Sequence, residues 1–220
     1  EMVVAEYLWW RGLDSVDYVL ATHADADHID GLNDVVRNFK VRGALVGRTP
    51  ANDAEFKKFA NSLQTTHTDL EVVQAGDVLD FGNVKVKILW PVGLGSASRS
   101  ANNDSVVLRL EFGAVSMLLT GDIEKEAESQ ILAGGNNVKA DVVKVPHHGS
   151  RTSSTEGLVA AAKPQFAIIS VGQQSMFGHP HKEVVERWQK SGAEVLTTGK
   201  SGTITVETDG KTLSVRKFVN

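Results

Sequence analysis

The chain has 220 residues, of which 41% are hydrophobic and 23% charged, and we expect one compact domain over residues 1–220. This composition excludes disordered and fibrous proteins. No stretch of the sequence reaches the roughly 20 apolar residues that span a bilayer, and no signal peptide is visible. The absence of cysteine excludes disulfides and thiolate metal sites, so any metal must be held by histidine, carboxylate, backbone or water.

The amino-terminal part of the sequence alternates between strands and helices. Residues 16–22 are apolar and rich in β-branched side chains, which predicts a buried strand. Apolar residues then recur at helical spacing over 29–39. A short strand over 43–46 and a helix that Asn52 or Asp53 caps complete this part.

The pattern changes to shorter pieces after residue 70. Residues 71–73 and 84–90 predict antiparallel strands, and the small-residue loop over 93–100 is free to line a site. The remaining predicted elements are strands over 106–112, 115–120, 141–146 and 166–171, helices over 123–132, 156–162 and 182–191, and a closing hairpin over 203–207 and 212–218.

A histidine and aspartate cluster lies where the first predicted strand runs into the first helix, with the sequence His-Ala-Asp-Ala-Asp-His from His23. His23 and Asp25 are two residues apart in an extended stretch and therefore point to the same side. Asp27 and His28 lie at the turn into the helix, so four ligands can surround two adjacent cations. The alternative is that Asp25, Asp27 and Asp30 only cap the helix.

Three further groups of polar residues follow predicted strands. Asp122 follows Gly121 at a strand end, where it can bridge two metals; the alternative is a helix cap. Alternating strand geometry should send one side chain of the pair His147 and His148 towards the site and the other elsewhere. One histidine is expected to bind metal while its neighbour acts on substrate. The alternative is a surface pair that caps a turn. His179 and His181 either join the site or form a rigid loop before the last helix.

These motifs resemble the metallo-β-lactamase superfamily, whose His-x-His-x-Asp-His signature appears here with Asp25 in place of the second histidine. The variant looks like the carboxy-terminal domain of ComEC-type competence proteins, and the likeness runs from about Val16 to about Lys182. The other segments that carry it are Asn102-Asn103-Asp104-Ser105, Leu119-Thr120-Gly121-Asp122, Val145-Pro146-His147-His148-Gly149-Ser150 and Gly178-His179-Pro180-His181.

The resemblance implies an α/β fold, the four-layer αββα metallo-β-lactamase sandwich. Such domains usually open with strands that bear an Asp-Val-Gly-Gln-Gly-Asp type sequence. Nothing like it precedes Glu1, so we expect the chain to lack the first strands of the fold.

The resemblance also assigns roles to individual residues. The implied metal ligands are His23, Asp25, Asp27, His28, Asp122 and one histidine of the His147 and His148 pair, with Asn102 or Asn103 near a third-ligand position. The residues expected to act in catalysis are Asp27, His148 and His179. Those expected to bind substrate are Asn103, Ser105, Ser150, His179 and His181, and further donors to a nucleic-acid backbone are Lys144, Arg151 and Lys182.

We expect two divalent metal ions, because two cations activate a water and stabilise charge on a leaving oxygen. The carboxylate of Asp25 favours hard cations such as Mn²⁺, and Zn²⁺ also fits such ligands. The spare histidine of the pair, His179 and His181 are available to orient a phosphate or to protonate the leaving group.

The resemblance implies that the substrate is DNA, which is hydrolysed during DNA uptake. The net charge of −4 argues against broad attraction to nucleic acid, although a local basic rim can still bind a phosphodiester. Alternatives are hydrolysis of a phosphorylcholine ester, lactone or thioester on the same fold, or a non-catalytic DNA-gating module. The resemblance implies a bacterial protein attached to the outer face of the inner membrane.

Overall fold

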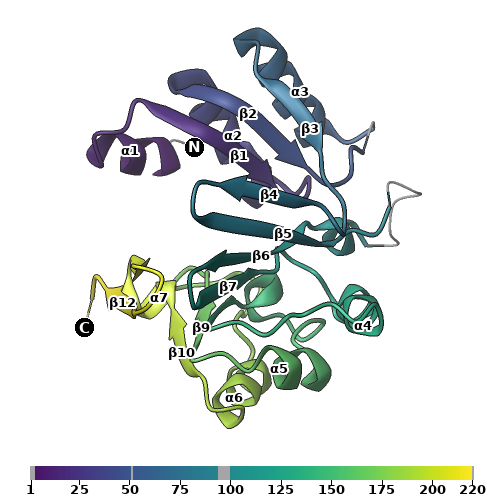
Figure 1. Cartoon of the computed structure of the whole chain (residues 1–220), viewed down its shortest axis with the longest axis vertical. Helices are drawn as coiled ribbons and strands as arrows, with labels where there is room; N and C mark the ends of the chain where they lie inside the picture. Colours follow the sequence, from purple (N-terminus) through teal and green to yellow (C-terminus); the bar gives the residue numbers. More distant parts are fainter. Residues whose placement is uncertain (1–2, 51, 94–99, 220) are drawn as a thin grey trace. The chain divides into compact units, whose positions relative to one another are not determined.

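The computed structural model describes residues 3–50, 52–93 and 100–219 (Figure 1). The chain forms two compact units, of which unit 1 comprises Glu1–Gln74 and Pro91–Val106, and unit 2 comprises Ala75–Trp90 and Val107–Asn220. The chain therefore enters the second unit, returns briefly to the first and ends in the second. The single domain expected over residues 1–220 stays a prediction.

Unit 1 alternates strands with helices and, in its described residues, holds a parallel sheet of order β1-β2-β3. Parallel neighbours need long crossovers, and the helices supply them. In chain order its elements are α1 (Val3–Trp10), β1 (Ser15–Ala21), α2 (Ala26–Asn38), β2 (Lys40–Val46), α3 (Ala54–Thr66), β3 (Asp69–Val72) and the 3₁₀ helix η1 (Ala101–Asp104).

The core of unit 1 lies between its sheet and helices α2 and α3. Ile29 and Val36 of α2 are almost fully buried, as is Phe59 of α3, which follows from the helical spacing of the apolar residues. The carboxylate of Asp53 accepts a hydrogen bond from the Phe56 amide at 2.9 Å and so caps α3. Of the two predicted caps, Asp53 is thus the one that the structure shows.

Unit 2 contains a sheet of order β10-β9-β8-β7-β6-β5-β4 among its described residues, antiparallel from β4 to β7 and parallel from β7 to β10. Its strands are β4 (Val78–Phe81), β5 (Val84–Trp90), β6 (Val107–Phe112), β7 (Val115–Leu119), β8 (Val142–Lys144), β9 (Phe166–Ile169), β10 (Glu194–Thr197) and the separate hairpin β11 (Ile204–Thr208) and β12 (Leu213–Lys217). Its helices are α4 (Lys125–Ala133), the 3₁₀ helix η2 (Pro146–Gly149), α5 (Glu156–Ala162), α6 (Lys182–Lys190) and α7 (Thr198–Ser201).

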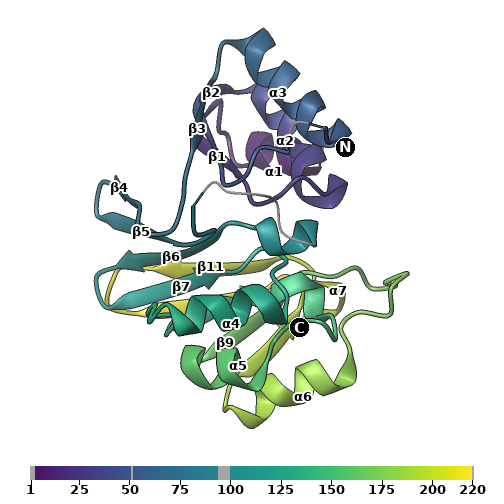
Figure 2. The same cartoon turned by 90° about the vertical axis from the view of Figure 1, so that its right-hand side faces the viewer.

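The two faces of the large sheet are covered differently (Figure 2). Leu118 is fully buried and packs in a cluster with residues of α4, α5 and α6, such as Trp188. Its neighbour Met117 points to the opposite face, as alternation along a strand requires, and lies near Val206 and Leu213 of the hairpin. The helices and the hairpin therefore shield opposite faces of this sheet.

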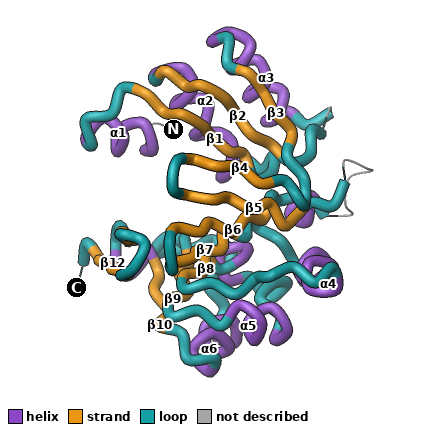
Figure 3. The backbone as a smooth tube through the Cα atoms, viewed as in Figure 1, coloured by secondary structure: helices purple, strands orange, loops and turns teal. Residues whose placement is uncertain are grey.

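Most predicted elements are present, and the differences are instructive (Figure 3). Residues 84–90 form an antiparallel strand as expected. The expectation of an antiparallel strand over residues 71–73 is wrong, because β3 joins the parallel sheet of unit 1. Helix α1, which the sequence did not predict, carries Trp9 and Trp10. Trp9 stacks on Phe39, whereas Trp10 is 79% exposed. In the described residues, no helix has both the length and the apolar character needed to cross a bilayer.

Part of the loop expected over residues 93–100 lies outside the described residues. The helices and strands of the two units form the mixed α/β class that was expected. The fold places residues 23–28 directly after β1, and it places Asp122 and the His147 turn after the parallel neighbours β7 and β8. Loops after parallel strands are the usual position for ligand-binding residues in α/β proteins.

Candidate functional site

The first histidine cluster lies in unit 1, where β1 ends and α2 begins. The rings of His23 and His28 have centroids 4.3 Å apart. The Nε2 atom of His23 lies 3.5 Å from a carboxylate oxygen of Asp25, and the Nε2 atom of His28 lies 3.8 Å from one of Asp27. The structure thus brings all four predicted ligands of this motif together, with a buried (His23) and a partly buried (His28) imidazole beside more exposed carboxylates.

The position of the aspartates bears on the alternative of simple helix capping. Asp25 occupies the N-cap position of α2, yet its side chain makes no capping hydrogen bond with the described residues. Asp30 is engaged elsewhere, in an ion pair with Lys58. The carboxylate of Asp25 is therefore placed beside His23 rather than on the helix end, which favours the ligand interpretation for this residue.

Hydroxyl groups contact the first cluster on the side opposite the carboxylates. Thr22 Oγ1 lies 3.0 Å and Ser105 Oγ 3.2 Å from Nδ1 of His23, and Thr22 Oγ1 also lies 3.4 Å from Nδ1 of His28. The Val106 amide donates to the Thr22 carbonyl at 2.8 Å and anchors this segment. Contacts at Nδ1 orient an imidazole so that Nε2 is the nitrogen available to a metal.

Residues 103–105 also belong to unit 1, and Ser105 supports His23 through its hydroxyl group. Asn103 and Ser105 are both buried, and the Asp104 carboxylate pairs with Arg48 at 3.0 Å. Sequence reasoning missed the contact between Ser105 and His23, because it joins residues 82 positions apart. The expected role of Asn103 and Ser105 in substrate binding stays a prediction.

Ser105→Ala is expected to weaken metal binding by about 10- to 100-fold, because partners that orient a ligating histidine contribute that much to affinity. Isothermal titration with Mn²⁺ or Zn²⁺ measures the effect. The control is Ser62→Ala, which removes another buried hydroxyl of unit 1. The partners of this hydroxyl among the described residues are not histidines and include Asn33 at 2.7 Å and Arg37 at 3.0 Å. Equal affinity of wild type and Ser105→Ala would show that the hydroxyl does not position His23.

The second cluster lies in unit 2 around the buried carboxylate of Asp122. One of its oxygens lies 3.0 Å from Lys144 Nζ, and the other lies 3.2 Å from Nε2 of His148. The Nδ1 atom of His148 lies 2.6 Å from the Ser170 carbonyl. The hydrogen bond to Asp122 raises the pKa of His148, against the opposing effect of burial. The structure thus joins Asp122 directly to His148.

The backbone at the histidine pair is not the extended strand end that was expected. His147 and His148 have φ values of 47° and 51°, and Gly149 follows at 80°. The left-handed region costs an ordinary residue roughly 1–2 kcal/mol, so this turn must be held by its surroundings. A Cβ atom on Gly149 would lie 2.7 Å from Cβ of Pro180, so only glycine fits. The alternation argument for the pair therefore does not apply.

Four histidines gather around this turn. The ring of His147 lies 5.7 Å from that of His179 and 6.4 Å from that of His148, and the rings of His179 and His181 are 5.1 Å apart. Burial lowers the pKa of His179, and the nearby positive charges of His147 and His181 act in the same direction. The amide of His181 donates to the Gly149 carbonyl at 3.0 Å. These contacts favour a functional site at His179 and His181 over the alternative of a rigid loop before the last helix.

Two acidic residues of unit 2 were missed from the sequence. Glu124 has an oxygen 3.5 Å from Nδ1 of His147, and its place two residues after Asp122 was the available signal. Glu128, on α4, is fully buried and accepts the amides of Ser154 at 2.5 Å and Thr155 at 2.7 Å. Glu128 therefore anchors the segment that follows the histidine turn.

The remaining predicted donors lie in unit 2 and differ in exposure. Ser150 is buried, with its hydroxyl 3.0 Å from that of Thr152. Arg151 is exposed and pairs with Glu183 at 2.6 Å. Lys144 forms an ion pair with Asp122. Its expected contact with a nucleic-acid backbone stays a prediction.

The donor set of both clusters fits a hydrolytic divalent metal. Imidazole nitrogens and carboxylate oxygens are the available ligand atoms, and histidine and aspartate groups able to hold an ion are present. Such a set suits Zn²⁺ and, with its share of carboxylates, Mn²⁺.

Comparisons with known proteins agree with this geometry. The family model described as the metallo-beta-lactamase superfamily matches residues 5–173. ComE operon protein 3 of Bacillus subtilis is 35% identical over 204 residues, which cover 93% of this chain and 26% of that protein. Competence protein ComA of Neisseria gonorrhoeae is 34% identical over 104 residues, 47% of this chain and 15% of that protein. The chain thus spans about a quarter of the length of the first relative and less of the second.

One solved structure extends the comparison of folds. The metallo-beta-lactamase fold protein YhfI from Bacillus subtilis matches with a TM-score of 0.53 at 14% identity, over 90% of this chain and 80% of that one. At this identity the likeness concerns the fold alone.

Proposed function

The chain belongs to the metallo-β-lactamase superfamily, and from this premise we propose that it is a metal-dependent phosphodiesterase that hydrolyses DNA during DNA uptake. The observation that carries the proposal is the cluster after β1, where the buried imidazole of His23 and the partly buried imidazole of His28 each lie beside an exposed carboxylate. A purely structural metal site has no need of open carboxylates, whereas a hydrolytic site must admit water and substrate. The similarity to competence proteins supports DNA as the substrate.

Each cluster supplies proposed metal ligands. They are His23, Asp25, Asp27 and His28 in unit 1, with Asp122 and His147 or His148 in unit 2. When bound, two divalent cations activate water and offset the charge of a phosphodiester. Mn²⁺ is favoured because Asp25 replaces an imidazole by a hard oxygen donor, and Zn²⁺ fits the same residues.

The other side chains of the clusters have proposed roles in handling the substrate. His179 lies beside His147 and is placed to protonate the leaving oxygen or to hold a phosphate oxygen. Asp27 of the first cluster and His148 of the second also have proposed catalytic roles, and His181 donates to the phosphate. In the whole protein, this part is proposed to lie at the outer face of a bacterial inner membrane, where it meets incoming DNA.

A substrate panel tests the proposal. The purified chain is incubated with single-stranded and double-stranded DNA in Mn²⁺, Mg²⁺ or Zn²⁺, and in parallel with a β-lactam, a phosphorylcholine ester, a lactone and a thioester. We expect metal-dependent cleavage of DNA and at most slow turnover of the other compounds. Turnover of one of those compounds without DNA cleavage would overturn the choice of substrate. DNA binding without any cleavage would instead indicate a non-catalytic module.

A further inference from the structure

A groove of about 760 Å³ in unit 2 runs from His179 and Pro180 along α6 and β10 to α7. Figure 1 shows α6, β10 and α7 in the yellow-green colours of the carboxy-terminal part of the chain. Concave sites of roughly 300–1,000 Å³ accept ligands of small-molecule size, which fits a short stretch of a single strand. The groove is continuous with the proposed site through His179, whose ring contacts that of His147.

The charge of the groove suits an anion. Lys182 and Lys200 line it, and none of its described lining residues is an aspartate or a glutamate. Lys182 pairs with Glu186 at 3.5 Å, but both side chains are exposed, and such pairs contribute little. A phosphate can therefore compete for this ammonium group.

The remaining lining combines hydrogen-bond donors with an apolar floor. Gln173, Gln189 and Ser201 supply amide and hydroxyl groups, and Val195 and Leu196 supply apolar surface. Phosphate oxygens accept hydrogen bonds from such donors, while sugar and base faces pack on apolar side chains. The combination matches a nucleic-acid strand better than a small inorganic anion.

We propose that this groove binds the sugar-phosphate backbone of a single DNA strand next to the phosphodiester that is cleaved. The inference rests on the proposed function, since DNA is the substrate considered there. His179 lies at one end of the groove and marks its junction with the histidine cluster. Lys182 and Lys200 hold phosphates beyond that point.

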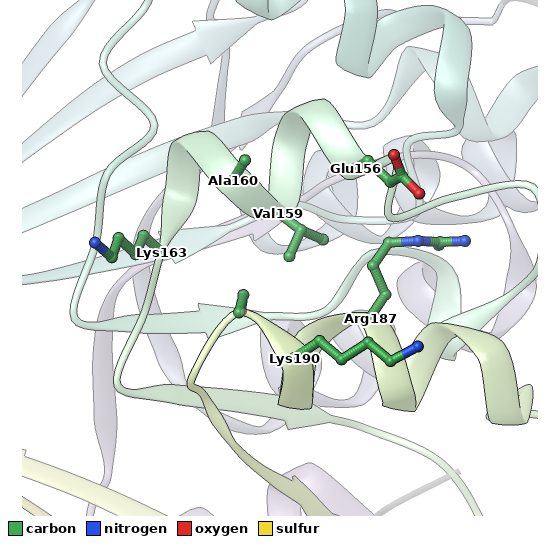
Figure 4. Close-up of a pocket in the computed structure, with 7 residues that line it drawn as sticks. Glu156, Val159, Ala160, Lys163, Arg187 and Lys190 are labelled. Carbon is green, nitrogen blue, oxygen red and sulfur yellow. The ribbon is translucent and has the colours of Figure 1, made fainter.

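A second basic pocket, between α5 and α6, is the alternative site for a phosphate backbone. It has a volume of about 470 Å³ and is lined by Lys163, Arg187 and Lys190, but Glu156 lines it as well (Figure 4). Arg187 is also engaged, since Nη1 donates to the Ser154 carbonyl at 2.6 Å. The groove that holds Lys200 is therefore the better anion site.

The test compares two double variants of equal charge, Lys182→Gln with Lys200→Gln and, as the matched control, Lys163→Gln with Lys190→Gln. Fluorescence anisotropy with a labelled single-stranded oligonucleotide, in EDTA, measures binding without cleavage. We expect the groove variant to bind about tenfold more weakly and the control to bind like wild type. The slope of log affinity against log salt should fall by about 1.4, because each phosphate contact on a single strand contributes about 0.7.

The outcomes separate this inference from the proposed function. Wild-type binding by the groove variant, or an equal loss in the control, overturns the groove whether or not DNA is cleaved. A selective loss in the groove variant supports the groove even if the wild-type chain cleaves no DNA in metal, a result that would overturn only the nuclease proposal.

Discussion

Asp27→Ala is expected to lower the rate of metal-dependent DNA cleavage by roughly 10³-fold while the chain stays folded. The side chain of Asp27 is 68% exposed beside His28, so its removal leaves no cavity in the core. Loss of a proposed metal ligand forfeits several kcal/mol of transition-state stabilisation, and each 1.36 kcal/mol is tenfold in rate. The carboxylate also lies in the first turn of α2, where its loss costs the helix only about 0.3–1 kcal/mol.

The matched control for this variant is Asp34→Ala, on the same helix but outside the motif. Single-turnover rates on single-stranded DNA are measured for wild type and both variants, and circular dichroism confirms folding. Asp34→Ala should cleave like wild type. Wild-type cleavage by Asp27→Ala would contradict the ligand assignment and would point to a contaminating nuclease.

Glu128→Ala is expected to lower the free energy of unfolding of unit 2 by about 3 kcal/mol. The carboxylate is the acceptor for the buried amides of Ser154 and Thr155, and an unsatisfied buried donor costs about 1–3 kcal/mol. Trp188 reports on this segment, because its Nε1 donates to Ser154 Oγ at 3.2 Å. Urea unfolding followed by tryptophan fluorescence gives the change, and the exposed Glu126→Ala on the same helix is the control.

The pH dependence of stability provides a second readout for the same residue. Burial raises the pKa of Glu128 above that of an unfolded carboxyl, which is about 4.3. The folded state then binds the proton of Glu128 more tightly than the unfolded state does. The free energy of unfolding of the wild type therefore falls as the pH rises from the unfolded pKa through the folded pKa. Glu128→Gln, which cannot ionise, should lack this decline. A Glu128→Ala variant as stable as Glu126→Ala would contradict the anchoring role.

The sequence predicted the local features of the fold and of the first cluster well. Residues 16–22 have strong strand character, and the helix over 156–162 was predicted with the bounds that α5 has. The spacing of His23 to His28 is itself local, so its geometry follows once a strand meets a helix there. Strand pairing is different, because periodicity does not say which neighbour a short strand chooses. The expectation of an antiparallel strand over residues 71–73 was wrong for that reason, since β3 pairs in parallel with β2.

The second cluster depended on contacts that the sequence does not display. The left-handed turn at His147 and His148 leads into Gly149, which lies against Pro180 more than thirty residues later. Ser105 reaches His23 across 82 positions, and Glu128 reaches Ser154 across 26. Long-range hydrogen bonds of this kind follow from the packed structure rather than from any pattern in the chain.

Removal and return of metal tests the central claim most directly. The chain is stripped with EDTA, dialysed, and assayed on single-stranded DNA before and after stoichiometric Mn²⁺ or Zn²⁺ is added. The account predicts no cleavage in the stripped protein and recovery that saturates at about two metal ions per chain. Cleavage that survives removal of metal, or metal binding that restores no cleavage of DNA, would contradict it.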